Sequence, residues 1–332
     1  MLYSELALLQ HCRHLDQRQR YAFGGIVSLE QQLRAVLDES RIEAGIAITQ
    51  IETGEQVEID GSGLYPMASV FKIPILATVG QQVAAGQFVL DERVALRNED
   101  KSAGSGILPY FDAGLQPTRR DLITLMIIIS DNTATDMTVD LVGGAQVVED
   151  TMHALGLTDI FFKMNCKDLL KSLWPAELAG RPVEEIRAWS DANDILRDGA
   201  AFSRAGDNNV SSAASMTRLN VMLYQGEIVQ GAVRDELIRI LQTQQYNQRL
   251  PRFLPSGVPF AHKTGTIGPF CNDSGVITIA PDNHVAITAF VVWDEEKYFQ
   301  KPEARNQRLF EVESALGKIG RLTYDHYRGQ TA

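Results

Sequence analysis

The sequence predicts an α+β fold in which both ends of the chain contribute to one sheet and a helical domain is inserted between them. Five β-rich runs lie near the two ends, at residues 44–51, 56–62, 258–267, 274–280 and 284–293. From about residue 66 to 255, apolar residues recur almost throughout at helical spacing. This order predicts a sheet domain made of residues 1–65 and 256–332, and a helical domain made of residues 66–255.

Local signals support the individual elements. The first strands are joined by ETGE, which is typical of a hairpin turn. Before them, Ser28 precedes a run with helical periodicity at 28–39, and a helix at about 303–319 ends the chain. The central helices end near glycines or polar turn residues. Pro74 falls early in its helix, where a missing N–H costs little. Residues 1–20 also have a helical pattern.

Composition excludes several functional classes. The chain has 332 residues, 45% of them hydrophobic, and a net charge of −11 without any block of basic residues among aromatics. Binding to nucleic acid or to an anionic membrane surface is therefore not expected. The longest apolar runs, such as residues 122–129, are too short to cross a bilayer. No signal peptide is apparent, so we expect a soluble protein, cytoplasmic unless a signal peptide was removed or lies upstream.

The cysteines indicate neither a metal site nor a disulfide framework. Cys12, Cys166 and Cys271 are far apart and form no C-x-x-C pair. The HCRH segment at residues 11–14 has no second ligand cluster to complete a tetrahedral zinc site. We therefore expect no metal and no cofactor.

Three short motifs carry the functional signal. Ser69 and Lys72 are three residues apart at the start of an apolar helix, which places both on one face and suits a hydroxyl nucleophile beside an amine base. This pattern alone occurs by chance about once in a chain of this length. However, SDN follows at 130–132 and KTG at 263–265. The three motifs in this order are far less frequent by chance than any one of them.

With these motifs the sequence resembles the β-lactamase and penicillin-binding protein superfamily, and most closely the serine hydrolases related to class A β-lactamases. The resemblance covers roughly residues 28–156 and 206–295, including PMASVFKIPIL, LMIIISDNTATD and LPSGVPFAHKTG. It implies an antiparallel sheet flanked by helices, an adjacent all-helical domain, and an active site in the groove between them.

The resemblance and simple chemistry assign the catalytic roles. Ser69, at a helix N-terminus, would be the nucleophile, and its backbone N–H would help to bind an oxyanion. Lys72 would be the base, with a pKa lowered by burial and by Lys263. Ser130 would relay a proton to the leaving group. Asp131 is expected to brace a loop or cap a helix.

The same reasoning assigns the binding roles. Asn132 would bind the amide side chain of the substrate, and the N–H of Thr266 would be the second oxyanion donor. Lys263 and Thr264, with Gly265 completing KTG, would bind a substrate carboxylate. His262 alternates away from Lys263 along the strand and is expected to be structural.

The sequence departs from class A in one respect. Class A enzymes carry a glutamate that activates the water for deacylation, but no E-x-x-L-N motif follows SDN here. The nearest candidate is Glu177 in WPAELAG, within a helical-looking segment that extends to about residue 205. Glu184 and Glu185 are expected on a solvated face.

We therefore predict a monomeric serine hydrolase that opens β-lactam rings through an acyl-enzyme on Ser69. Because the glutamate motif is missing, a penicillin-binding-type D-peptidase or esterase with slow deacylation is an alternative. A non-catalytic module that binds β-lactams or peptidoglycan fragments is a further alternative. The intact set of motifs argues against it.

Overall fold

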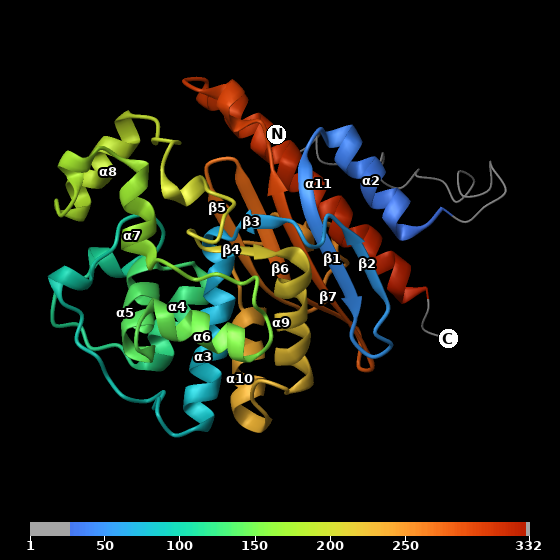
Figure 1. Ribbon diagram of the computed structural model, residues 1–332, viewed down its shortest axis with the longest axis horizontal. Coiled ribbons are helices and arrows are strands. Elements are labelled where there is room, and N and C mark those ends of the chain that lie inside the picture. Colours follow the sequence, from blue (N-terminus) through green and yellow to red (C-terminus); the bar gives the residue numbers. More distant parts are fainter. Residues whose placement is uncertain (1–26, 330–332) are drawn as a thin grey trace.

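A five-stranded antiparallel sheet forms the centre of the computed structural model, which describes residues 27–329 (Figure 1). Its order is β2-β1-β7-β6-β5, with bounds β1 Glu43–Gln50, β2 Gln56–Ile59, β5 Phe260–Ile267, β6 Phe270–Ala280 and β7 Asn283–Val292. Strands from the two ends pair directly, since Ile46 of β1 lies opposite Ala289 of β7. The α+β fold with an antiparallel sheet is confirmed.

Helices cover both faces of this sheet. Helices α2 (Leu29–Ser40) and α11 (Pro302–Arg328) lie on one face, and α9 (Ala213–Gln225) lies on the other (Figure 1). Successive side chains of β1 point to opposite faces of the sheet. Ile46 and Ile48 are buried with residues of α2 and α11, whereas Ala47 is buried in the core on the other face, where Thr217 of α9 donates a hydrogen bond to its carbonyl.

Local capping determines where α2 begins, and long-range packing determines where α11 ends. As predicted, Ser28 caps α2 and forms a capping box with Gln31. Helix α11 continues nine residues beyond the predicted end at 319 because Thr323 and Tyr327 are still fully buried in its last turns. Its far end therefore packs as part of the core.

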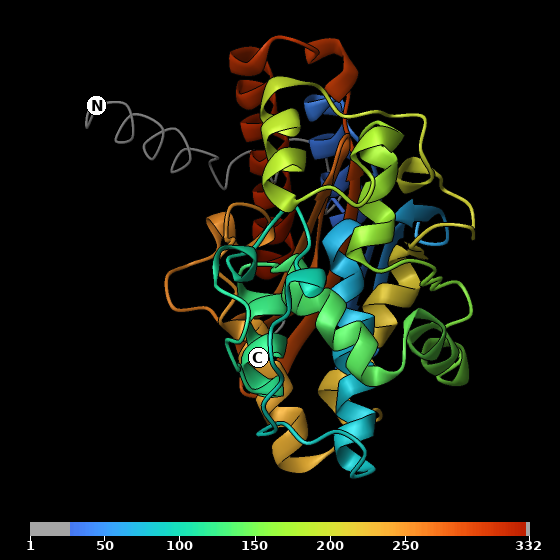
Figure 2. The same cartoon turned by 90° about the vertical axis from the view of Figure 1, so that its left-hand side faces the viewer.

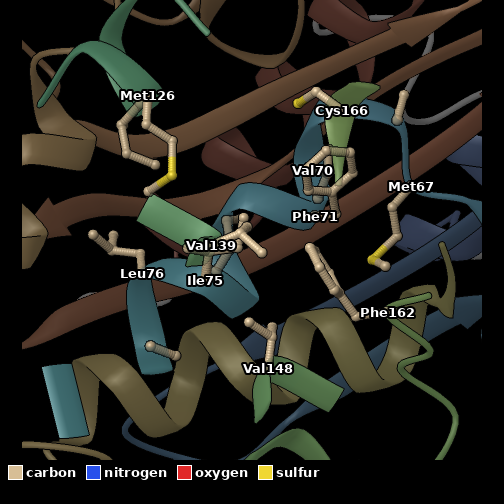
Figure 3. Close-up of a cluster of buried hydrophobic side chains, with 14 of the residues drawn as sticks. Met67, Val70, Phe71, Ile75, Leu76, Met126, Val139, Val148, Phe162 and Cys166 are labelled. Atoms are coloured by element: carbon tan, nitrogen blue, oxygen red, sulfur yellow. The ribbon is translucent and has the colours of Figure 1, made fainter. Parts of the chain in front are cut away.

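The helical part of the chain contains α3 Lys72–Ala84, α4 Arg119–Ile128, α5 Asn132–Val142, α6 Ala145–Ala154, α7 Cys166–Leu170, α8 Val183–Ala192 and α10 Gly231–Gln242. Within it, α3 is contacted by α4, α5, α6 and α10, and the α7 and α8 segment lies at the other end of this part (Figure 1 and Figure 2). The core of the helical part includes Phe71 and Phe162, whose rings meet edge to face 5.4 Å apart (Figure 3). The division into two domains at residues 65 and 256 stays a prediction.

Two details differ from the expected helical pattern. The periodic run at 119–142 is broken between α4 and α5, where Ser130 has a positive φ of 59°. Strands β3 (Leu64–Pro66) and β4 (Val210–Ser212) form a separate two-stranded sheet. At three residues each, they are too short to give a periodic signal.

The segment from α7 to residue 205 contains α8 and several 3₁₀ turns, and it contacts the residues that follow the sheet through an ion pair. Arg197 in this segment is 2.7 Å from the carboxylate of Glu295, a residue just after β7. The same carboxylate also forms an ion pair with Arg305 of α11. Glu295 is almost fully buried, so this ion pair is shielded from solvent. Among residues 27–329, no helix has both the length and the apolar character needed to span a membrane.

Candidate active site

The first two motifs meet at the side chain of Lys72. Its Nζ donates hydrogen bonds to the Oγ and the carbonyl oxygen of Ser130, both at 2.8 Å, and to Oδ1 of Asn132 at 3.0 Å. Lys72 is fully buried at the start of α3, and Ser130 and Asn132 lie on either side of the start of α5. Residues 58 and 60 positions apart in sequence are thus in direct contact.

The third motif lies against the turn that carries Ser69. A Cβ atom at Gly265 would be 2.6 Å from the Met67 carbonyl oxygen and 3.0 Å from the Ser69 nitrogen, so only glycine allows β5 to approach so closely. The neighbouring strand β6 reinforces the contact, because Asn272 Nδ2 donates to the Pro66 carbonyl at 2.8 Å. The turn that carries Ser69 is therefore held by the sheet.

A cavity of about 360 Å³ lies where these elements meet. Its polar lining includes Ser69, Ser130, Asn132, Thr264 and Thr266. Apolar side chains from α7 and the end of β5 also line it, namely Leu169, Leu170 and Ile267. An apolar pocket with a few convergent polar groups is typical of a small-molecule site.

The backbone is strained on both sides of this cavity. Ser69 does not begin the α-helix as expected. It lies in a 3₁₀ turn, Ala68–Phe71, directly before α3. Ala68, immediately before the nucleophile, has φ 45°, and Ser130 has φ 59°. Non-glycine residues in this region cost free energy and are found mostly where function requires the geometry.

Burial controls the charges of both lysines. It lowers the pKa of Lys72, against the influence of nearby acidic groups that include Asp131 and Asp136. For Lys263, burial again dominates, and the positive charges of Lys72 and Arg249 lower its pKa further, to well below its usual range. Both amines are therefore easier to deprotonate than in water.

Lys263 lies behind the cavity surface. It is fully buried, it is not among the residues that line the cavity, and its Nζ donates to the Thr264 carbonyl at 2.7 Å. With its lowered pKa, it is a weaker source of fixed positive charge than the sequence suggests.

Asp131 and His262 have the structural contacts that were expected. The Asp131 carboxylate accepts from the N–H groups of Ile107 and Leu108 at 2.7 and 2.9 Å, and it caps α5 through Ala134. His262 is buried with Nδ1 2.8 Å from the Asp273 carboxylate.

Glu177 does not lie with the other predicted residues. It is on the surface, in the 3₁₀ turn Ala176–Leu178, and is not among the residues that line the cavity. Glu184 and Glu185 are exposed at the start of α8, as expected. The structure thus gives no support to Glu177 as the deacylating base.

Arg249 and Cys166 are among the cavity-lining residues that the sequence motifs do not identify. Arg249 is buried and donates to the carbonyl oxygens of Gly265 and Asn272 at 2.8 and 2.6 Å, as well as to Thr266 Oγ1. Its position in the chain gives no local signal, because its partners are on other strands. Cys166 was considered only as a possible metal ligand or disulfide partner.

Nothing in the described part of the chain resembles a metal centre, since residues 27–329 contain no group of three His, Cys, Asp or Glu side chains placed to hold an ion. The HCRH segment and Cys12 lie outside the described residues, as does the helical pattern predicted for residues 1–20.

Comparison with known proteins gives matches over most of the chain. Residues 28–327 match the sequence model of the beta-lactamase enzyme family. The VEB-1 β-lactamase of Pseudomonas aeruginosa is 23% identical over 312 residues, which is 90% of each chain. The PER-1 extended-spectrum β-lactamase of the same species is 23% identical over 83% of each chain.

Solved structures show the same fold. A β-lactamase from Sphaerobacter thermophilus superimposes with a TM-score of 0.68 at 26% identity, over 89% of this chain and 96% of that one. PBP-A superimposes with a TM-score of 0.70 at 24% identity, over 91% and 96%.

Proposed function

Because this chain belongs to the beta-lactamase enzyme family, we propose that it is a serine hydrolase that opens β-lactam rings through an acyl-enzyme on Ser69. The observation that carries the proposal is the contact of Lys72 with Ser130 and Asn132 beside the Ser69 turn. That contact supplies a base and a proton relay next to a half-buried hydroxyl. The two Pseudomonas aeruginosa relatives named above are β-lactamases, which favours the same substrate class.

In the proposed acylation step, neutral Lys72 accepts the proton of Ser69 Oγ while Oγ forms a bond to the lactam carbonyl carbon. The N–H groups of Ser69 and Thr266 stabilise the oxyanion. When the C–N bond breaks, Ser130 Oγ gives its proton to the leaving nitrogen and regains one from the Lys72 ammonium. The 2.8 Å hydrogen bond between Lys72 and Ser130 supports this relay.

Substrate recognition is proposed for the β5 side of the cavity. Arg249 is charged at any physiological pH, and its guanidinium lies beside Thr266. We assign it the fixed positive charge that binds a substrate carboxylate, together with the hydroxyl of Thr264. Lys263 supports this end of the site from behind, and Asn132 is available to the amide side chain.

The proposal is tested by hydrolysis of a chromogenic cephalosporin by the full chain. We expect acylation by the wild type and loss of it in Ser69→Ala, with intact mass spectrometry showing a single adduct only when Ser69 is present. Absence of both hydrolysis and adduct with correctly folded wild-type protein would contradict the proposal. Sedimentation of the same sample tests the expectation that the protein is a monomer.

The recognition roles are tested with a matched pair of substrates, a penicillin and an aryl ester without a carboxylate. Arg249→Gln should weaken reaction with the penicillin much more than with the ester, since only the penicillin carries the negative charge. Equal losses on both substrates would contradict this assignment. The same comparison tests the esterase alternative, which predicts that the wild type prefers the ester.

A further inference from the structure

We propose that Lys72 is the proton acceptor in both half-reactions, and that the acyl-enzyme is consequently long-lived, because the residue facing Asn132 from α7 is a cysteine instead of a carboxylate. This inference rests on the proposed function, since it concerns how the acyl group on Ser69 is removed. It follows from the chemistry of the groups around the cavity that could accept a proton from water.

Carboxylates are scarce around this cavity. Among the described residues that line it, the one carboxylate is that of Glu313 on α11. Glu313 Oε1 is 3.4 Å from Arg249 Nε, so its charge is paired with the guanidinium and not with Lys72. The same oxygen accepts a hydrogen bond from Arg249 Nε, so it is already engaged by the cation.

Cys166 occupies the position beside the catalytic amine. Its Sγ is 3.4 Å from Asn132 Oδ1, the same oxygen that accepts a hydrogen bond from Lys72. The thiol is almost fully buried, and burial raises its pKa well above the usual range. A neutral thiol does not remove a proton from water.

The buried carboxylates near Cys166 have structural partners. Asp136 accepts hydrogen bonds from the backbone N–H groups of Cys166 and Lys167 at 2.6 and 3.1 Å, and from Ser102 Oγ at 2.5 Å. Asp136 is not among the cavity-lining residues, and its bonds hold the start of α7 in place. Asp131 is occupied in the same manner by three backbone N–H groups.

Lys72 is therefore left as the base for deacylation. A water molecule attacks the ester carbonyl carbon while its proton passes to neutral Lys72 Nζ. The bond from that carbon to Ser69 Oγ then breaks, and Oγ regains a proton from the Lys72 ammonium. Ser69 is fixed by the chain in the turn directly before Lys72, whereas among the described residues that line the cavity no carboxylate besides Glu313 is present to position the water, so deacylation is the slower step.

The wild type provides the first test. Mixed with penicillin G, it should give a rapid burst of about one equivalent, then slow turnover, with an adduct on Ser69 visible by intact mass. Adding a carboxylate should accelerate the second step. Cys166→Glu is expected to shorten the lifetime of the adduct by about 100-fold, the size of a typical general-base contribution. Cys166→Gln, of equal size but uncharged, is the matched control and should not shorten it.

Two results would overturn the inference: turnover without accumulation of the adduct in the wild type, or equal lifetimes in the Glu and Gln variants. If Cys166→Glu does not fold, the pH dependence of the wild type decides. With one base, acylation and deacylation should rise with pH through the same apparent pKa, set by Lys72 among Asp131, Asp136, Cys166 and Lys263. Different apparent pKa values for acylation and deacylation would refute the inference. Absence of both turnover and adduct would instead refute the proposed function.

Discussion

Replacing Gly265 by alanine should impair acylation by moving β5 away from the nucleophile turn. The added Cβ would lie 2.6 Å from the Met67 carbonyl oxygen, 2.9 Å from the Val70 nitrogen and 3.0 Å from the Ser69 nitrogen. An ordinary contact is about 3.4 Å, so the strand and the turn must separate by up to about 0.8 Å. All three atoms belong to the backbone, which cannot rotate away as a side chain would.

The expected loss follows from that displacement. A misplacement of about 1 Å can cost about 100-fold in rate, so we expect the acylation rate to fall by about 10- to 100-fold. Overpacking of this kind should also lower the free energy of unfolding by about 1–3 kcal/mol.

Stopped-flow acylation with a chromogenic cephalosporin and urea denaturation measure the two effects. Gly329→Ala is the matched control, because a Cβ there would have only ordinary contacts, the nearest at 3.5 Å to the His326 carbonyl oxygen. If Gly265→Ala acylated within twofold of the wild type at unchanged stability, the proposed dependence of the site on this close contact would be wrong.

Three further predictions concern the base and the loop that supports it. Lys72→Ala should lower the acylation rate by about 1,000-fold, measured as burst rate, and a loss below tenfold would argue against its role as base. Because burial lowers the pKa of Lys72 and only the neutral amine accepts a proton, the acylation rate should rise with pH and level off above that pKa; a fall between about pH 6 and 9 would contradict the assignment. Asp131→Ala should lower the free energy of unfolding by about 3 kcal/mol in urea titrations, because the N–H groups of Ile107 and Leu108 lose their acceptor. Asp131→Asn, which keeps one acceptor oxygen, should lower the free energy of unfolding by less.

Much of the fold was predictable because its signals are local. The β-hairpin at residues 43–59 is encoded by two β-rich runs joined by a turn sequence, and Ser28 precedes a helix with a capping box that involves Gln31. The break before α5 and the length of α11 were harder to predict from the sequence. Both depend on partners distant in sequence, as the contacts of Asp131 with Ile107 and Leu108 illustrate.

The candidate site shows the same division. Ser69, Lys72, Ser130 and Asn132 were selected from short motifs, because the chemistry of a nucleophile and its base requires particular residue types at particular spacings. Glu177 was chosen for its place in the chain alone, and it lies on the surface outside the cavity.

By itself, the sequence determined the class of fold and selected the candidates for nucleophile, base and proton relay, because each is encoded in a few neighbouring residues or in periodicity. Only the tertiary structure decided that Lys263 lies behind the cavity, that Arg249 lines it, and that Cys166 lies beside Asn132. Burial and charge pairing depend on which distant segments come into contact, and they determine what each side chain can do.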